Sequence, residues 1–415
     1  MVNVPQEIVD TIVEAIPTDH SMLKTCALVS SSFRYPAQKR LYKSVQLEFS
    51  QDTARHVYHG AALTPLQLHN ILAANPVLGK HVKHLSVLLP WSDGEGLLVN
   101  LDMLPCVCKF SMTRSQFGDP FRHGNAHWSS LSAHLRNDIY NIIRSPQVVD
   151  ISISNIDAFS APFLTTCAQL KSINLEYVTH TNSTDFLVDV PPTSARRGGL
   201  EVLRLMRIAD PRSFIDYFSA PLSILDISHL REYHTIMYNN VQDTAEFQTL
   251  SEPFARSLEK LSFEFSHNYG SRRMEPGDFD LTNMQNLRIL ELTSDDSVVE
   301  MHDWLEAFIY IALPENNVLQ TLSFTLPYDY HSDMGWREID TLLYNSFALA
   351  KTQVKFRFSP YFNSTKEGTD PELDEILEQD MPYLLERGAV LTWKKSLLYL
   401  TIPEDLNDWE YGEEF

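Results

Sequence analysis

The segment Leu-Glu-Val-Leu-Arg-Leu at residues 200–205 decides the fold. Its leucines follow the pattern L-x-x-L-x-L, and the last two are two residues apart, as on one face of a β-strand. The same pattern of apolar residues recurs through most of the chain. Its copies begin at Val82, Val107, Val148, Leu170, Leu200, Leu222, Leu258, Leu287 and Leu319, and Val354-x-Phe356-x-Phe358 is a further copy.

Successive copies begin 25, 41, 22, 30, 22, 36, 29 and 32 residues apart. Intervals of this size hold one strand and one helix, the unit of a leucine-rich repeat. Apolar residues at helical spacing predict helices in Ser130–Arg144, Met301–Leu313 and Met334–Ala350, and Asp185–Gly199 and Asn268–Asp280 are expected to be exposed insertions. The sequence therefore predicts an α/β repeat fold: an irregular leucine-rich-repeat solenoid over residues 46–400, with parallel strands on its concave face.

Strand alternation also predicts which side chains are free to bind. If the last two apolar residues of each copy face the core, the residue between them faces outward. These outward positions are Ser86, Ser111, Ser152, Asn174, Arg204, Asp226, Ser262, Glu291, Ser323 and Arg357. Charges gather near the middle of the array, and the candidate target-binding residues are Asn174, Glu176, Arg204, Asp226, Glu264 and Glu291. Exposed ion pairs add little stability, so recognition is one reason for such a patch, and ordinary solvated pairs are the alternative.

The first 45 residues split into three short helical pieces. Asn3 and Ser21 are placed to cap the first two, and Pro36 to begin the third. One apolar face of the first piece consists of four residues at helical spacing, Ile8, Ile12, Ala15 and Ile16. Because folds below about 40 residues need a staple or a partner, these helices are not expected to bury a core of their own.

This opening segment resembles the F-box family, specifically the fungal type followed by degenerate leucine-rich repeats. The resemblance covers about the first 45 residues and is carried by Val4-Pro5-Gln6-Glu7-Ile8, Ile12, Ile16, residues 23–30, Phe33 and Arg40-Leu41-Tyr42. Val4 stands where the family usually has leucine, and Phe33 where tryptophan is common. The resemblance implies docking on the Skp-type adaptor of a cullin–RING ubiquitin ligase through, or with support from, Val4, Pro5, Ile8, Leu23, Cys26, Val29 and Phe33.

Charge and hydropathy narrow the possible partners. The formal charge is −21, from 33 basic and 54 acidic residues, and such a field repels the phosphates of nucleic acid. No apolar run is long enough to span a membrane, and the acidic start is unlike a signal peptide. We therefore expect a soluble cytoplasmic or nuclear protein without nucleic-acid or membrane partners. Residues 401–415 form an acidic tail that also carries aromatic residues.

Signatures of catalysis and metal binding are missing from the sequence. There is no G-x-S-x-G, Walker-type or dinucleotide-binding glycine motif. Cys106-x-Cys108 lacks the spacing of a zinc site, the paired histidines lack a third ligand, and the four cysteines are expected to be buried thiols. We expect no metal, no cofactor and no enzyme activity.

Together these features predict the substrate-recognition subunit of an SCF-type cullin–RING ubiquitin ligase. Its F-box would bind the Skp-type adaptor, and its repeats would bind a target protein of unknown identity. The alternative is a repeat-protein scaffold or binding module whose N-terminal helices only cap the solenoid.

Overall fold

The computed structural model shows an α/β protein in which a helical segment precedes one large parallel sheet. The structure describes residues 4–16, 20–49, 62–89, 103–114, 126–181, 198–208, 210–220, 223–237, 247–265, 280–294, 313, 317–327, 337, 340–341, 352–359, 382 and 390–393. The predicted acidic tail, nearly all of the helices expected after residue 300, and most of both predicted insertions lie outside these residues. At the end of the first insertion, Gly198–Gly199 forms a short strand instead of a loop.

Three helices open the chain, α1 (Gln6–Ala15), α2 (His20–Val29) and α3 (Ser31–Leu41). The Ser30 side chain caps α3 by accepting a hydrogen bond from the Phe33 N–H, at 3.4 Å. The predicted starts at Ser21 and Pro36 are therefore wrong, because both residues lie inside helices. Asn3 lies outside the described residues, and Pro5 occupies the N-cap of α1 without a side-chain cap.

Pro36 in the middle of α3 removes one helical N–H, which would otherwise bond the carbonyl of Ser32. That carbonyl instead accepts a hydrogen bond from Gln6 Nε2 of α1, at 3.1 Å. The proline thus frees an acceptor that ties α1 to α3.

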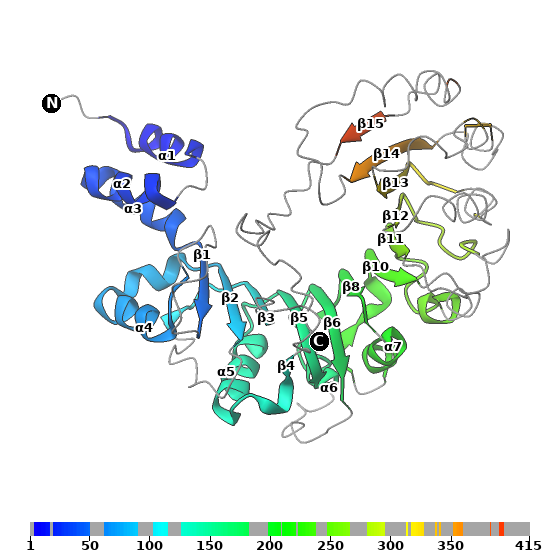
Figure 1. Ribbon diagram of the computed structural model, residues 1–415, viewed down its shortest axis with the longest axis horizontal. Coiled ribbons are helices and arrows are strands. Elements are labelled where there is room, and N and C mark those ends of the chain that lie inside the picture. The colour runs from blue at the N-terminus through cyan, green and yellow to red at the C-terminus, as the bar shows by residue number, and fades with distance from the viewer. Residues whose placement is uncertain are drawn as a thin grey trace, which may run out of the picture.

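One parallel sheet of thirteen described strands follows, and its strand order matches chain order. The strands are β1 (Ser44–Glu48), β2 (His84–Leu89), β3 (Lys109–Arg114), β5 (Asp150–Phe159), β6 (Ser172–His180), β8 (Val202–Met206), β10 (Glu232–Met237), β11 (Lys260–Phe265), β12 (Ile289–Ser294), β13 (Thr321–Pro327), β14 (Gln353–Ser359) and β15 (Val390–Trp393), with the short β4 (Ala126–His127) paired to β5. The sheet curves into an open arc (Figure 1).

A backbone hydrogen-bond pattern repeats where the strands begin. The carbonyl of Lys171, just before β6, accepts bonds from the N–H groups of Glu201 and Val202, both at 2.9 Å. The same double acceptance occurs at Lys43, Lys83, Cys108, Val149, Glu201, Arg231, Glu259 and Arg288. The strands from β2 to β13 of the main sheet, apart from the short β4, therefore each start against their predecessor in the same way, as expected when equivalent units stack.

The strand pattern predicted the core correctly. The two closing apolar residues of all nine complete copies are buried, for example Leu203 and Leu205 on β8. The residues between them are partly exposed, except Ser323, which is buried. One continuous apolar cluster runs from Val45 on β1 to Val354 on β14.

The copy beginning at Leu222 was assigned to the wrong sheet. Its strand β9 (Leu225–Asp226) pairs only with β7 (Gly198–Gly199), in a separate two-stranded sheet. The neighbour of β8 is β10. The buried residues Leu230, just before β10, and Tyr233 and Thr235 within it have the spacing of a copy but hide the pattern, because two of them are not aliphatic.

With β10 in place the repeat becomes more regular. The aligned positions Asn174, Arg204, His234, Ser262, Glu291, Ser323 and Lys355 are 30, 30, 28, 29, 32 and 32 residues apart. His234 thus replaces Asp226 in the predicted row, and Lys355 replaces Arg357.

Helices cover the outer side of the arc (Figure 1). They are α4 (Pro65–Ala74), α5 (Ala133–Arg144), α6 (Ala161–Leu164) and α7 (Pro211–Ser219), with short 3-10 turns η1 (Pro76–His81), η3 (Trp128–Ser130) and η4 (Ile227–His229). The helix predicted over Ser130–Arg144 is confirmed as α5, which Ser132 caps. No helix in the described parts of the chain is long and apolar enough to cross a membrane.

Candidate functional site

The N-terminal helices expose an apolar surface. Ile8 and Ile12 of α1 are about half exposed, and Leu28 and Val29 of α2 are 83% and 70% exposed. Val4 and Pro5 are exposed at the start of the same unit. α1 buries Val9 and Val13 instead. Of the face predicted from Ile8, Ile12, Ala15 and Ile16, the first three residues stay exposed, whereas Ile16 is partly buried and packs against the small core.

Beneath this surface the three helices share a small core. It contains Val13, Leu23 and Ala37, with Cys26 and Phe33 among the partly buried residues packed against it. The expectation that these helices bury no core of their own is therefore wrong. Among the seven predicted adaptor residues, Val4, Pro5, Ile8 and Val29 are exposed, whereas Leu23 is buried and Cys26 and Phe33 are partly buried. Leu23 can support the face but cannot contact a partner directly.

Arg40 fixes the position of α1 on α3. Its Nη1 donates hydrogen bonds to the carbonyls of Val13, Glu14 (3.1 Å) and Ile16 (2.7 Å) at the end of α1. Carbonyls at the end of a helix have few partners within it (here the Ile16 N–H bonds only that of Val13), and a cation at a helix C-terminus is also favoured by the helix dipole. One side chain therefore holds the end of the helix that exposes Ile8 and Ile12.

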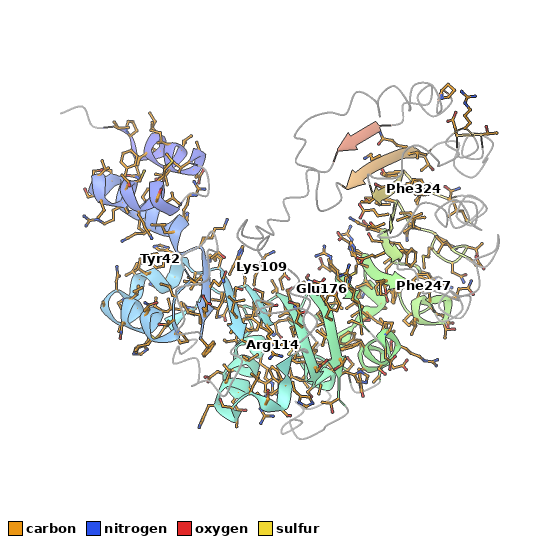
Figure 2. All side chains as sticks on the ribbon, in the orientation of Figure 1. Tyr42, Lys109, Arg114, Glu176, Phe247 and Phe324 are labelled. Atoms are coloured by element: carbon orange, nitrogen blue, oxygen red, sulfur yellow. The ribbon has the colours of Figure 1, made fainter. Side chains whose placement is uncertain are left out.

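The second surface is the side of the sheet opposite helices α4–α7 (Figure 1). We use the term inner face for the residues on strands β3, β5, β6, β8, β10, β11 and β12 whose side chains point away from the apolar core. Each strand contributes three such positions. Lys109 and Glu176 carry their side chains toward the inside of the arc (Figure 2). On β3 and β5 this face carries mostly small polar residues, Ser111, Thr113, Ser152 and Ser154. Asn174 on β6 donates a hydrogen bond to Ser152, at 2.9 Å.

Charges gather around His234 in the middle of the inner face. Arg204 lies 3.8 Å from Glu232, and Lys260 lies 2.9 Å from Glu291, which also accepts a hydrogen bond from Ser262. His234 Nε2 is buried and has no hydrogen bond; the Glu232 carboxylate is 3.6 Å away. Burial lowers the pKa of His234 to about 4, helped by the nearby charges of Arg204 and Lys260. The imidazole is therefore neutral at pH 7.

Three neighbouring strands contain a left-handed residue at the same level. Asn155, Tyr177 and Arg207 have φ angles of 58°, 51° and 52°, and each directly follows one of the aligned residues Ser154, Glu176 and Met206. This conformation costs roughly 1–2 kcal/mol for a residue other than glycine. This conformation keeps the three side chains on the same side of the sheet as the inner face. The next residues, Ile156, Val178 and Ile208, then point into the core.

Arg207 uses this conformation to bridge strands. Its Nε and Nη2 donate to Glu264 Oε1 at 3.1 and 2.9 Å, its Nη1 donates to the Tyr177 hydroxyl, and its guanidinium lies 5.1 Å from the Tyr177 ring centroid. Burial alone would lower the pKa of Arg207, but the bonds to Tyr177 and Glu264 raise it overall. Residues from β6 and β11 are thus joined through the end of β8, which sequence spacing could not reveal.

A rim of alternating charge runs along the strand starts. Lys171 pairs with Glu201 at 3.0 Å, and Arg231 pairs with Glu259 at 2.7 Å. Two open cavities of about 440 and 550 Å³ lie along this rim. Asp226 lines the larger one and lies 3.8 Å from His229, so it belongs to the rim and not to the inner face. The prediction that Asp226 follows Arg204 in one row of outward positions is therefore wrong, because the two residues occupy different sheets.

The described residues contain no group of three or more His, Cys, Asp or Glu side chains that could hold a metal ion. All four cysteines are free thiols, and only Cys167 is fully buried. Cys26, Cys106 and Cys108 are partly exposed, which corrects the expectation that all four are buried.

Comparison with known proteins yields no assignment. No protein-family profile matches this chain, and no curated protein resembles it in sequence.

Proposed function

We propose that this chain is the substrate-recognition subunit of an SCF-type cullin–RING ubiquitin ligase. In this proposal α1–α3 form the F-box that binds a Skp-type adaptor, and the remaining units form a leucine-rich-repeat solenoid whose inner face binds the target. The chain contributes positioning and no bond-making residue.

The exposed apolar surface of α1 and α2 carries the proposal. Ile8, Ile12, Leu28 and Val29 leave large apolar side chains in water on helices whose own core is small. Apolar surface of this kind marks protein interaction sites. The regular strand starts support the second half of the proposal, because equivalent stacked units are the hallmark of repeat proteins.

Co-purification with a Skp-type adaptor tests this function. Ile8→Asp and Val29→Asp place a charge on the exposed surface without touching the small core. Leu66→Asp is the matched control, because Leu66 is 57% exposed on α4, outside the helical unit. The proposal requires that the wild type and Leu66→Asp retain the adaptor and that both surface variants lose it. Absence of the adaptor from the wild-type preparation would reject it.

A cap is the second candidate role for the helices. Tyr35 of α3 makes an edge contact with His81 of η1, with ring centroids 5.1 Å apart, and Tyr42 packs on the main core. If the helices only seal the first strand, Tyr35→Ala lowers the melting temperature of the whole sheet, and no adaptor is retained.

A further inference from the structure

All but one of the carboxylates on the inner face form ion pairs with basic side chains. Its carboxylates are Asp150, Glu176, Glu232, Glu264 and Glu291. Four of them have basic partners, which are Lys109 (2.8 Å), Arg204 (3.8 Å), Arg207 (2.9 Å) and Lys260 (2.9 Å). The side chain of Glu176 has no ion pair or hydrogen bond with the described residues. The lysines and arginines on the described strands of this face are each paired with another carboxylate, so none of them is left over for Glu176.

The surroundings of Glu176 suit a long basic side chain. In register, Ser154 lies on one side of it and Met206 on the other. The small serine leaves space beside the carboxylate, and the partly exposed Met206 provides apolar surface for an aliphatic stem. Lysine and arginine combine such a stem with a charged head.

The next residue makes the site rigid on one side. Tyr177 directly follows Glu176 in the left-handed conformation, and Arg207, which is itself bonded to Glu264, contacts its ring and hydroxyl. If this turn served the backbone alone, glycine would adopt it at lower cost. Tyrosine and arginine there build a fixed wall beside Glu176 instead. Arg207 is itself committed to Glu264, so it does not neutralise Glu176.

We propose that Glu176 is the anchor for a lysine or arginine side chain in a basic segment of the target protein. The charge of −21 on this chain favours the approach of such a segment. This inference rests on the proposed function, in which the inner face holds the target, and it adds the chemical class of that target.

A charge-swap experiment on the full chain tests the anchor. Random dodecapeptides displayed on phage are selected against the wild type, and the affinity of the best synthetic peptide is then measured by calorimetry. The selected peptides should carry lysine or arginine. Glu176→Gln should weaken binding about two- to fivefold, as expected for one partly exposed ion pair. Glu176→Lys should abolish binding of that peptide, and exchanging the peptide's basic residue for glutamate should restore it.

Glu259→Gln is the matched control, since Glu259 lies on the rim and pairs with Arg231; it should leave the affinity unchanged. Failure to select basic peptides, equal affinity of the wild type and Glu176→Gln, or no rescue by the swapped peptide would each overturn the inference. Adaptor co-purification of Glu176→Gln, run in parallel, separates the two proposals, because Glu176 is remote from α1 and α2. If neither the wild type nor Glu176→Gln retained the adaptor, while the swapped peptide still rescued binding to Glu176→Lys, only the ligase role would be rejected.

Discussion

Arg207 at the end of β8 reaches past β10 to Glu264 on β11, where its Nη2 lies 2.9 Å from Oε1. Glu264 is only 18% exposed, so removing its partner leaves a poorly solvated carboxylate. We expect Arg207→Ala to destabilise the protein by about 1–3 kcal/mol in urea unfolding. Arg207→Gly loses the same contacts but relaxes the φ of 52°, so it should be about 1 kcal/mol more stable than Arg207→Ala. If Arg207→Ala were as stable as the wild type, the contact between Arg207 and Glu264 would not stabilise the protein.

The bond from Gln6 to Ser32 should depend on Pro36. In the wild type, Gln6→Ala is expected to cost about 0.5–1 kcal/mol, because the freed carbonyl loses its protein donor. In a Pro36→Ala background the helix can supply its own N–H to Ser32, so the same change should cost much less. A double-mutant cycle of unfolding free energies measures the difference. Equal costs in the two backgrounds would show that the proline is not the reason for the bond.

His234 should make stability fall at mildly acidic pH. Its pKa is lowered to about 4 in the folded protein, against an ordinary value of 6.5. Between pH 4 and 6.5, His234 takes up a proton in the unfolded chain but not in the folded one. The stability that the neutral imidazole contributes is therefore complete above pH 6.5 and is lost as the pH falls toward 4. The slope is at most about 1.4 kcal/mol per pH unit.

Unfolding of the wild type and His234→Gln between pH 6.5 and 4.5 checks this effect. Because His81 and His84 also have lowered pKa values, only the difference between the two proteins reports on His234. The glutamine variant should lose less stability over this range. Parallel curves would contradict the assignment of a neutral, buried imidazole.

Cys167 should be chemically silent in the native protein. Burial raises the pKa of its thiol to about 12, so almost no thiolate exists at pH 8. We expect disulfide-exchange reagents to label Cys106 and Cys108, which are partly exposed, long before Cys167. Labelling followed by peptide mass spectrometry gives the order, and early modification of Cys167 would contradict the packing around it.

Strand alternation explains how much of the sheet could be predicted. Two leucines that are two residues apart in an extended strand lie on the same face of the sheet. The pattern L-x-x-L-x-L therefore predicted the buried residues of eight strands of the main sheet correctly. β10 was missed because Tyr233 and Thr235 occupy the positions where the pattern expects aliphatic residues. Asp226 was misplaced because Leu225 and Ile227 are buried too, although in a different sheet.

The binding surfaces were harder to predict, since they depend on contacts between distant residues. No glycine marks the left-handed turns at Asn155, Tyr177 and Arg207, and Arg207 and Glu264 are 57 residues apart. In α1, both Ile8/Ile12 and Val9/Val13 have helical spacing, so periodicity alone could not decide which pair α2 and α3 would cover.

The affinity of the purified full chain for a Skp-type adaptor, measured by calorimetry, tests the central claim most directly. The account predicts saturable binding by the wild type, at least tenfold weaker binding by Ile8→Asp, and unchanged binding by Leu66→Asp. No heat of binding with the folded wild type, or equal affinity of all three proteins, would contradict it.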